Sequence, residues 1–283
     1  MAIDTTRGIA GLKGALRYVR AYRDQIFVVK LGGDVLSEPE TLDSVRGQEY
    51  PKLEHIVVDG GSTDGTLDLL RGAADVRWIS EPDDGRVDAA NKGLRMATGD
   101  VIAWLNADDR YEPGALRAVG EALARNPDTA WASGYCLIID ASGREIRRAV
   151  TRYKSFLLRR WTLGLYLTQN FVSDPATFVR RHALEAIGAL NPRYRTSHDY
   201  DLWLRVARRF GPPVIVERPL ASFRMAEGTL SMRGFEAQFA EHAAVARSHG
   251  AGYPLAVAVN RAMSGVIVMV YKALRFRRRL VSR

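Results

Sequence analysis

The sequence is poor in cysteine, with Cys136 alone among 283 residues. It therefore excludes an internal disulfide framework and a cysteine-rich metal site, and it fits a reducing compartment. Long uninterrupted apolar runs are also missing. The best candidate for a membrane span, residues 255–274, is too polar to cross a bilayer comfortably. Its interruptions are Asn260, Arg261 and Lys272. The first ten residues have no apolar core, so we expect no signal peptide.

Positive charge is what the chain has in excess. Its formal net charge is +9, while its 47% hydrophobic and 26% charged residues are ordinary for a globular protein. Five arginines crowd the last nine positions: Arg275, Arg277, Arg278, Arg279 and Arg283. Because a nucleic-acid patch would be expected on the main domain, we predict no nucleic-acid partner. The tail instead suits an anionic membrane surface.

Apolar runs alternate with helical patterns over the first half. The pattern predicts strands at 26–31, 54–59 and 101–105, and helices ending near 47 and spanning 87–97. This alternation is typical of an α/β fold with a mostly parallel central sheet flanked by helices. Ligands bind at the carboxyl ends of strands in such sheets. Asp59 and Asp108 both fall there, which is the first sign of a site.

The second half is more mixed and ends in helices. The pattern predicts a hairpin of 130–140 with 144–150, a helix over 201–210, strands at 214–217 and 220–224, and helices beyond about 235. We therefore expect three regions. They are a helical extension at 1–25, an α/β domain at 26–235 and a helical, basic tail at 236–283.

Asn106-Ala107-Asp108-Asp109 follows a buried strand directly. A carboxylate pair at a strand end suits a hard cation that keeps water or phosphate ligands. A departing diphosphate needs such an ion, because its oxygen gains negative charge. The structural alternative is an Asp-rich turn, since Asp and Asn favour turns and helix caps.

A series of segments resembles the family 2 glycosyltransferases in order and spacing. They are IVVDGGSTDGT, ISEPDDGRVDAANKGLRMATGDVIAWLNADDRYEPGAL, ATFVRRHALEAIGALNPRY, HDYDLWLRVARRFG and PLASFRMAEGTLS. The resemblance spans about residues 41–231. It implies a GT-A fold, inversion at the anomeric carbon, a nucleoside-diphosphate sugar donor and Mg²⁺ or Mn²⁺.

The resemblance assigns roles to the strand-end residues. Asn106-Ala107-Asp108 takes the place of the family's Asp-x-Asp motif, with Asn106 departing from the usual first Asp. Asp108 would coordinate the metal that bridges the diphosphate, and Asp109 would support it. Asp59 would line the nucleotide pocket. Gly60 stands where many relatives carry a second Asp, which leaves the nucleotide's identity open.

Further donor contacts are implied on both sides of the motif. Arg86, Asp88 and Asn91 lie in the segment that faces the donor in relatives, where Arg86 could pair with a phosphate and the other two with hydroxyls. A solvated helix face is the alternative for each. Arg224, in SFRMAEGTLS, would lie near the diphosphate, although Ala226 occupies the neighbourhood of an expected His.

Asp199 matches the family's general base, and His198 replaces the usual first acid of that pair. A carboxylate can take the acceptor hydroxyl's proton when proton transfer and attack are concerted. The predicted helix that follows would favour its ionised form. The alternative is a helix N-cap, a role that Asp201 could also fill. Trp203 is expected in the core rather than against an acceptor sugar.

Residues 15–42 do not look like this family. ALRYVRAYRDQIFVVKLGGDVLSEPETL resembles the opening of amino-acid kinases of the acetylglutamate kinase type, in which Lys30, Gly32 and Gly33 would hold ATP phosphates. We interpret the segment, with its atypical Val29–Gly33 loop, as a replacement of the first strand. A kinase-like phosphotransferase and an inactive, membrane-associated scaffold are the alternatives.

We therefore predict an inverting, metal-dependent glycosyltransferase that acts on a hydroxyl acceptor. The family's acceptors are often polysaccharides or lipid-linked glycans. Such acceptors suit a cytoplasmic protein resting on the inner face of the cell membrane. The alternative for the tail is a helix packed on the domain.

Overall fold

The computed structural model describes residues 27–31, 40–225 and 234–281. Its strands are β1 (Phe27–Leu31), β2 (Leu53–Asp59), β3 (Val76–Ser80), β4 (Val101–Ile102), β5 (Arg110–Tyr111), β6 (Trp131–Ile139), β7 (Thr177–Arg180) and β8 (Val214–Arg224). Its helices are α2 (Glu40–Arg46), α3 (Thr66–Arg71), α4 (Arg86–Met96), α5 (Ala115–Arg125), α6 (Arg148–Arg159), α7 (Leu163–Thr168), η1 (Asp174–Ala176), α8 (Arg181–Ile187), α9 (His198–Phe210), α11 (Phe235–Ser248) and α12 (Pro254–Val281).

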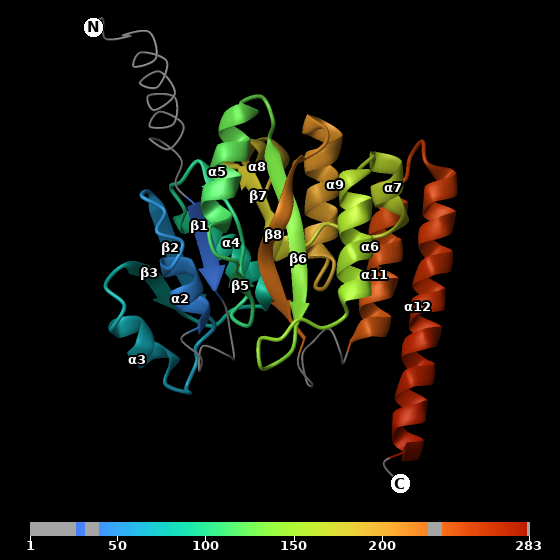
Figure 1. Cartoon of the computed structure of the whole chain (residues 1–283), viewed down its shortest axis with the longest axis horizontal. Coiled ribbons are helices and arrows are strands. Elements are labelled where there is room, and N and C mark those ends of the chain that lie inside the picture. The colour runs from blue at the N-terminus through green and yellow to red at the C-terminus, as the bar shows by residue number, and fades with distance from the viewer. Residues whose placement is uncertain (1–26, 32–39, 226–233, 282–283) are drawn as a thin grey trace, which may run out of the picture.

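One mixed sheet runs through the molecule in the order β3-β2-β1-β4-β7-β6-β8-β5 (Figure 1). The first four strands in this order are parallel, as predicted. The strand β7 enters antiparallel to both β4 and β6, β8 runs parallel to β6, and β5 is antiparallel to β8. The predicted α/β architecture is confirmed, and every antiparallel pair of the sheet includes β7 or β8.

Helices cover both faces of the sheet and bury two hydrophobic cores. Side chains alternate along β2, so that Ile56 and Val58 enter one core while Val57 enters the other. The Ile56 core is covered by helices such as α4, α6 and α9, and the Val57 core by α2, α3 and α5. The β-branched run of β2 thus reads as a strand buried on both faces.

Several element boundaries differ from the prediction. The strand predicted at 101–105 leaves the ladder after Ile102, although the next three side chains remain buried. The predicted hairpin is wrong beyond one bridge at Glu145, because residues from Arg148 form α6 and pack Leu157 and Leu158 into the core. The two predicted strands at 214–217 and 220–224 form one, β8.

The C-terminal helices pack beside α7 and α9, with α12 outermost (Figure 1). Among the described residues, α12 is the one helix long and apolar enough to cross a membrane by length and composition, over Pro254–Lys272. The predicted extension at 1–25 lies outside the described residues, as do Gly32 and Gly33. Lys30 lies on β1, which pairs with β2 and β4.

Candidate active site

Asp59 ends β2 with its carboxylate turned into the protein. Its Oδ2 accepts hydrogen bonds from the backbone N–H of Gly61 (3.0 Å) and Ser62 (2.9 Å) and from Ser80 Oγ (2.6 Å). Its Oδ1 accepts one from Ser62 Oγ (2.5 Å). Burial raises the pKa of Asp59, but these donors outweigh it and the net pKa is lowered. Asp59 is 1% exposed, so it shapes the loop after β2.

Gly60 allows Asp83 to approach this strand end. A Cβ built at Gly60 would lie 2.9 Å from Asp83 Oδ2, so a side chain there would force that carboxylate to move. The Asp83 Oδ1 in turn accepts a hydrogen bond from Gly85 N at 2.8 Å, just before α4. Position 60 thus lacks the Asp of many relatives, but the carboxylate of Asp83 lies in the space beside it.

Asp109 is wholly buried and anchors the turn that presents Asp108. Its Oδ2 accepts a hydrogen bond from Asn106 Nδ2 at 2.8 Å, and its Oδ1 accepts one from Arg224 N at 3.0 Å. Burial, together with the charge of Asp108, raises the pKa of Asp109 to about 7. Both carboxylate oxygens of Asp109 thus accept hydrogen bonds from the protein. The side-chain amide of Asn106 is directed to Asp109 and not to solvent.

Asp108 is the acid of the pair that keeps its carboxylate for other partners. It is partly exposed, and within the described part of the chain no other residue donates a hydrogen bond to it. Burial raises the pKa of Asp108, while the positive charges of Arg86 and Arg224 act in the opposite direction. A half-buried carboxylate near two guanidinium groups is suited to bridging charged ligands.

Arg224 clamps the Asp108 turn to the end of β6. Its Nε donates to the carbonyl oxygen of Asp108 (3.0 Å), and its Nη1 donates to those of Asp140 (3.1 Å) and Ala141 (2.9 Å). The residue is 8% exposed. Its guanidinium is therefore largely used in holding the loops together.

The three predicted donor contacts of α4 have different surroundings. Arg86 is exposed at the first position of the helix, and its charge acts on both acids of the 108–109 pair. Asp88 accepts a hydrogen bond from Asp84 N (3.3 Å) and pairs with Lys92 (3.3 Å). The amide of Asn91 binds the Leu190 backbone, as donor at 2.9 Å and acceptor at 3.0 Å.

Asp199 lies in the first turn of α9, which begins at His198 rather than at the predicted residue 201. The N-cap position belongs to Ser197, so the N-cap alternative for Asp199 is wrong. Asp201 is buried and binds Arg205 and His249, each at 2.8 Å.

Asn170 and the aromatic core fix the surroundings of this turn. Asn170 Nδ2 donates a hydrogen bond to Asp199 Oδ2 at 2.9 Å, and Asn170 Oδ1 accepts one from Tyr166 Oη at 3.0 Å. Trp203 lies in the core, as predicted, with its ring stacked on Trp131 at 5.8 Å between centroids.

The turn of Asp108 and the first turn of α9 lie at the same edge of the sheet. At the carboxyl end of β6, Arg224 pairs with Ile139 and reaches the Asp108 turn. At its amino end, Trp131 Nε1 donates to the carbonyl oxygen of Gly211, which caps the C-terminus of α9 (2.9 Å). Thus α9 runs back along the sheet, and its amino end points to the carboxyl edge (Figure 1).

The sequence around this site matches a known protein family. The sequence model of glycosyl transferase family 2 matches residues 39–188, more than half of the chain. The chain belongs to glycosyl transferase family 2. The matched region contains the Asp59 loop, α4 and the Asp108 turn, whereas Asp199 and both C-terminal helices lie beyond it.

Curated relatives of similar sequence are named as glycosyltransferases. An uncharacterized glycosyltransferase of Mycobacterium tuberculosis is 31% identical over 173 residues, covering 59% of this chain and 62% of the relative. The chain thus spans less than two thirds of that relative's length. A PGL/p-HBAD biosynthesis glycosyltransferase of Mycobacterium bovis is 32% identical over 190 residues, covering 64% and 67%.

Solved structures confirm the predicted GT-A fold. Staphylococcus aureus TarS 1–349, in complex with UDP-GlcNAc, has a TM-score of 0.60 at 15% identity, covering 85% of this chain and 69% of that one. A mannosyltransferase from Pyrobaculum calidifontis, in complex with GDP-Man and Mn²⁺, has a TM-score of 0.55 at 19% identity, covering 93% and 88%.

Glu241 of this family 2 glycosyltransferase was missed by the sequence reasoning. Glu241 lies on α11, and its carboxylate accepts hydrogen bonds from residues 195–197, just before Asp199. Its Oε2 accepts hydrogen bonds from Thr196 N (2.8 Å), Thr196 Oγ1 (2.7 Å) and Ser197 N (3.0 Å), and its Oε1 accepts one from Arg195 N (3.2 Å). Burial raises the pKa of Glu241, but these donors make the net shift downward. A lone Glu in a helical pattern gave no signal for this role.

Asn170 was also missed, although a polar Gln169-Asn170 pair inside an apolar stretch was a weak signal. Burial lowers the pKa of Lys154 on α6, and the charge of Asp199 acts in the opposite direction. Burial raises the pKa of Cys136 to about 12, and the charge of Asp109 adds to this rise.

Proposed function

We propose that this glycosyltransferase moves a sugar from a nucleoside-diphosphate sugar to a hydroxyl acceptor with inversion at the anomeric carbon. The observation that carries the proposal is the common edge of the sheet shared by the Asp108 turn and the first turn of α9. An inverting displacement needs a group that handles the leaving diphosphate and another that handles the incoming hydroxyl. In this proposal Asp108 handles the leaving diphosphate and Asp199 handles the incoming hydroxyl.

Asp108 is the residue assigned to the metal and the diphosphate. No group of three or more His, Cys, Asp or Glu side chains that could hold a metal occurs among the described residues. One available carboxylate still fits Mg²⁺ or Mn²⁺, because such ions are often held by one or two carboxylates together with substrate phosphates. When bound, the ion supplies positive charge to the departing diphosphate. The Mn²⁺ and GDP-Man in the Pyrobaculum neighbour support this assignment.

Asp109 and Asn106 hold the Asp108 turn in this proposal, and Arg224 fixes it from β8. Asp109 retains a supporting role at the metal through this anchoring. Arg86 is the candidate for a phosphate contact, because it is exposed and its charge acts on Asp108. A guanidinium suits such a contact because it donates several hydrogen bonds in a fixed plane.

The remaining donor contacts are assigned by their hydrogen bonds. Asp59 shapes the nucleotide pocket through the loop after β2, and Asn91 supports α4 through Leu190. Asp88 remains a candidate for a ribose or sugar hydroxyl. The UDP-GlcNAc and GDP-Man neighbours support a nucleotide-sugar donor without selecting the nucleotide.

Asp199 is assigned as the general base. As the acceptor oxygen bonds to the anomeric carbon, its proton passes to a carboxylate oxygen of Asp199, and the bond from that carbon to the diphosphate breaks. Asn170 orients the carboxylate through Oδ2. A negative charge in the first turn of α9 also interacts favourably with the helix dipole.

The acceptor in this proposal is a polysaccharide or lipid-linked glycan, handled on the cytoplasmic face of a membrane. The basic tail at 236–283 favours that location. The kinase-like alternative rests on Lys30, Gly32 and Gly33 and predicts ATP-dependent phosphorylation of a carboxylate substrate. An inactive scaffold predicts neither reaction.

Thermal unfolding with a panel of nucleotide sugars tests the proposal. UDP- and GDP-sugars with Mn²⁺ or Mg²⁺ should raise the Tm of the wild type but not that of Asp108→Ala, because ligands that bind the native state stabilise it. Asp128→Ala, an exposed acid near the opposite edge of the sheet, is the matched control. Metal-dependent stabilisation that survives Asp108→Ala would contradict the metal role. Stabilisation by ATP that is lost in Lys30→Ala would favour the kinase.

A further inference from the structure

The helix α12 buries two polar side chains and exposes several large apolar ones. Asn260 is 2% exposed, and its Nδ2 donates hydrogen bonds to the carbonyl oxygen of Leu167 (3.1 Å) and to Tyr200 Oη (3.4 Å). Ser264, one turn on, is also buried. The opposite side carries a stripe of exposed apolar side chains: Leu255 (77%), Val259 (36%), Val266 (54%), Met269 (64%) and Val270 (51%).

This pattern differs from that of a helix that packs on a domain and faces water. A surface helix in water turns its apolar side to the core and its polar side to solvent. Buried polar groups and a continuous exposed apolar patch are the informative exceptions, and such a patch marks an interaction surface. The exposed stripe of α12 therefore suits a nonpolar partner.

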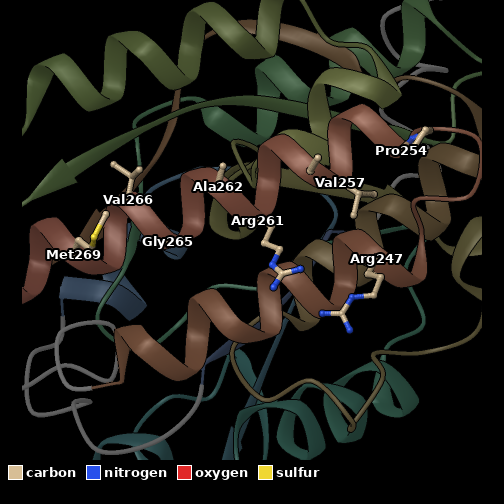
Figure 2. A pocket seen from close by; sticks show the side chains of 9 residues that line it. Arg247, Pro254, Val257, Arg261, Ala262, Gly265, Val266 and Met269 are labelled. Atoms are coloured by element: carbon tan, nitrogen blue, oxygen red, sulfur yellow. The ribbon is translucent and has the colours of Figure 1, made fainter.

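Two arginines border this stripe. A groove of about 790 Å³ between α11 and α12 is lined by apolar side chains, including Val257, Val266 and Met269, and by Arg247 and Arg261. Figure 2 shows the two guanidinium groups extending on the same side of the helix pair. Both arginines are exposed, and neither forms an ion pair within the part of the chain that the structure describes. Cations beside an apolar surface match a phosphate beside hydrocarbon.

We propose that the outer face of α12 and its groove with α11 dock on an anionic lipid bilayer. The apolar stripe enters the boundary between headgroups and acyl chains, and Arg247 and Arg261 bind lipid phosphates. Helices of this kind lie in the interface plane, and nearby basic residues strengthen their attachment to anionic lipid. The sequence of α12 continues the same chemistry, with Arg275, Arg277, Arg278 and Arg279 in its last turns.

A membrane span and a second copy fit the surface less well. Insertion of α12 would break the hydrogen bonds of Asn260 and carry Arg261 into hydrocarbon, where a charge is costly. A symmetric dimer would bring two copies of the same arginine-bordered surface together. Each chain already has a net charge of +9, so the contact would be repulsive. Docking on the surface of an anionic bilayer keeps Arg261 out of hydrocarbon, and the negative lipids attract the positive chain.

Vesicle flotation of the full chain tests the surface. Vesicles of phosphatidylcholine with phosphatidylglycerol should carry the protein up the gradient, and those of phosphatidylcholine alone should carry far less. The variant Arg247→Ala with Arg261→Ala should lower the partition coefficient roughly thirtyfold, at ~1 kcal/mol per basic residue. The variant Val266→Asp with Met269→Asp should abolish binding. Both positions of that pair are exposed, so circular dichroism should remain that of the wild type.

Matched controls lie away from α12, on α3 and α5 (Figure 1). Leu69→Asp changes an apolar side chain that is 42% exposed, and Arg125→Ala removes an exposed arginine. Both should float as the wild type does. Equal binding by the stripe variant and the wild type would overturn the proposal. So would resistance of the bound protein to high salt and alkali, which marks a spanning helix, or a dimer in solution that the stripe variant dissociates. The readout is binding, so its failure leaves sugar transfer untouched.

Discussion

Asn170 Nδ2 lies 2.9 Å from Asp199 Oδ2, and Tyr166 Oη holds the other end of the same amide at 3.0 Å. The assigned base is thus oriented by a residue outside its own helix. Asn170 precedes η1, and Tyr166 lies on α7. The helix α7, the segment before η1 and the helix α9 therefore meet to orient the carboxylate of Asp199.

Replacing Asn170 should impair turnover more than donor binding. Asn170→Ala removes the donor to Asp199, and we expect kcat to fall by about tenfold, since a hydrogen bond to a charged group contributes roughly 1.5 kcal/mol or more. Initial rates over a range of donor concentrations measure this split. Gln169→Ala is the control, because that amide binds the exposed Tyr153 hydroxyl instead. An equal loss in both variants would contradict the orienting role.

Glu241 should control both the stability and the activity of the α9 turn. Glu241→Ala removes the acceptor of four hydrogen bonds from residues 195–197, so we expect a loss of about 2–3 kcal/mol in the free energy of unfolding. Because this turn carries Asp199, kcat should fall while the KM for the donor is kept. Urea titration and kinetics measure the two effects.

Glu236→Gln provides the matched control on the same helix. Glu236 pairs with Lys272 at 3.3 Å, and both side chains are more than half exposed. Exposed pairs contribute little, so the change should cost under about 1 kcal/mol and leave kcat unchanged. Similar losses in Glu236→Gln and Glu241→Ala would show that α11 tolerates no substitution and would remove the specific role of Glu241.

His55 should make the protein sensitive to acid. It is buried on β2, neither ring nitrogen has a hydrogen-bond partner among the described residues, and burial lowers its pKa to about 4. Below about pH 6.5, His55 binds a proton in the unfolded chain but stays neutral in the folded protein. The contribution of His55 to the free energy of unfolding should therefore fall between pH 6.5 and 4, by roughly 3 kcal/mol, while Asp109, whose pKa is raised, acts in the opposite direction.

Substitution of His55 isolates this contribution. Between pH 6.5 and 4 the urea midpoint of His55→Leu should fall less, or rise more, than that of the wild type, and His182→Leu, at an exposed histidine, should follow the wild type. A profile in His55→Leu with the slope of the wild type would contradict the assignment.

Two glycines should respond in opposite directions to the same substitution. A Cβ at Gly134 would lie 2.5 Å from two carbons of Leu220 and 3.0 Å from the Val216 carbonyl oxygen, where β6 and β8 shift register. Gly134→Ala should cost about 1–3 kcal/mol. A Cβ at Gly265 meets nothing within 4 Å on α12, so Gly265→Ala should stabilise by up to about 1 kcal/mol. Urea titration of both variants decides; a neutral Gly134→Ala would contradict the packing.

The sequence predicted the elements whose signals are local. The β-branched run of β2 and the alternating pattern of the first half were correctly assigned as strands and helices. Motifs in series predicted the family and fold. Contacts between distant segments left no such signal, so Glu241 and Asn170 were missed. The predicted hairpin failed at Arg148 because the core that receives Leu157 and Leu158 decides the conformation there.

The predicted site residues divide by the direction of their polar groups. A sequence match gives a residue's position along a motif, but not whether its oxygens face a ligand or a backbone amide. Asp59, Asp109 and Asn91 match the motif and yet use their polar atoms within the protein. The carboxylate of Asp108, by contrast, accepts no hydrogen bond from another residue in the part of the chain that the structure describes. That distinction requires the folded contacts.

The most direct test of the account compares turnover with donor affinity in Asp199→Asn. Asparagine keeps the shape of the side chain but is a far weaker base, so kcat for transfer or donor hydrolysis should fall by about 10²- to 10⁴-fold. The Kd for the metal–nucleotide-sugar donor should remain within about threefold, because that ligand is assigned to Asp108. Undiminished turnover, or a selective loss of donor affinity, would contradict the division of labour between the two acids.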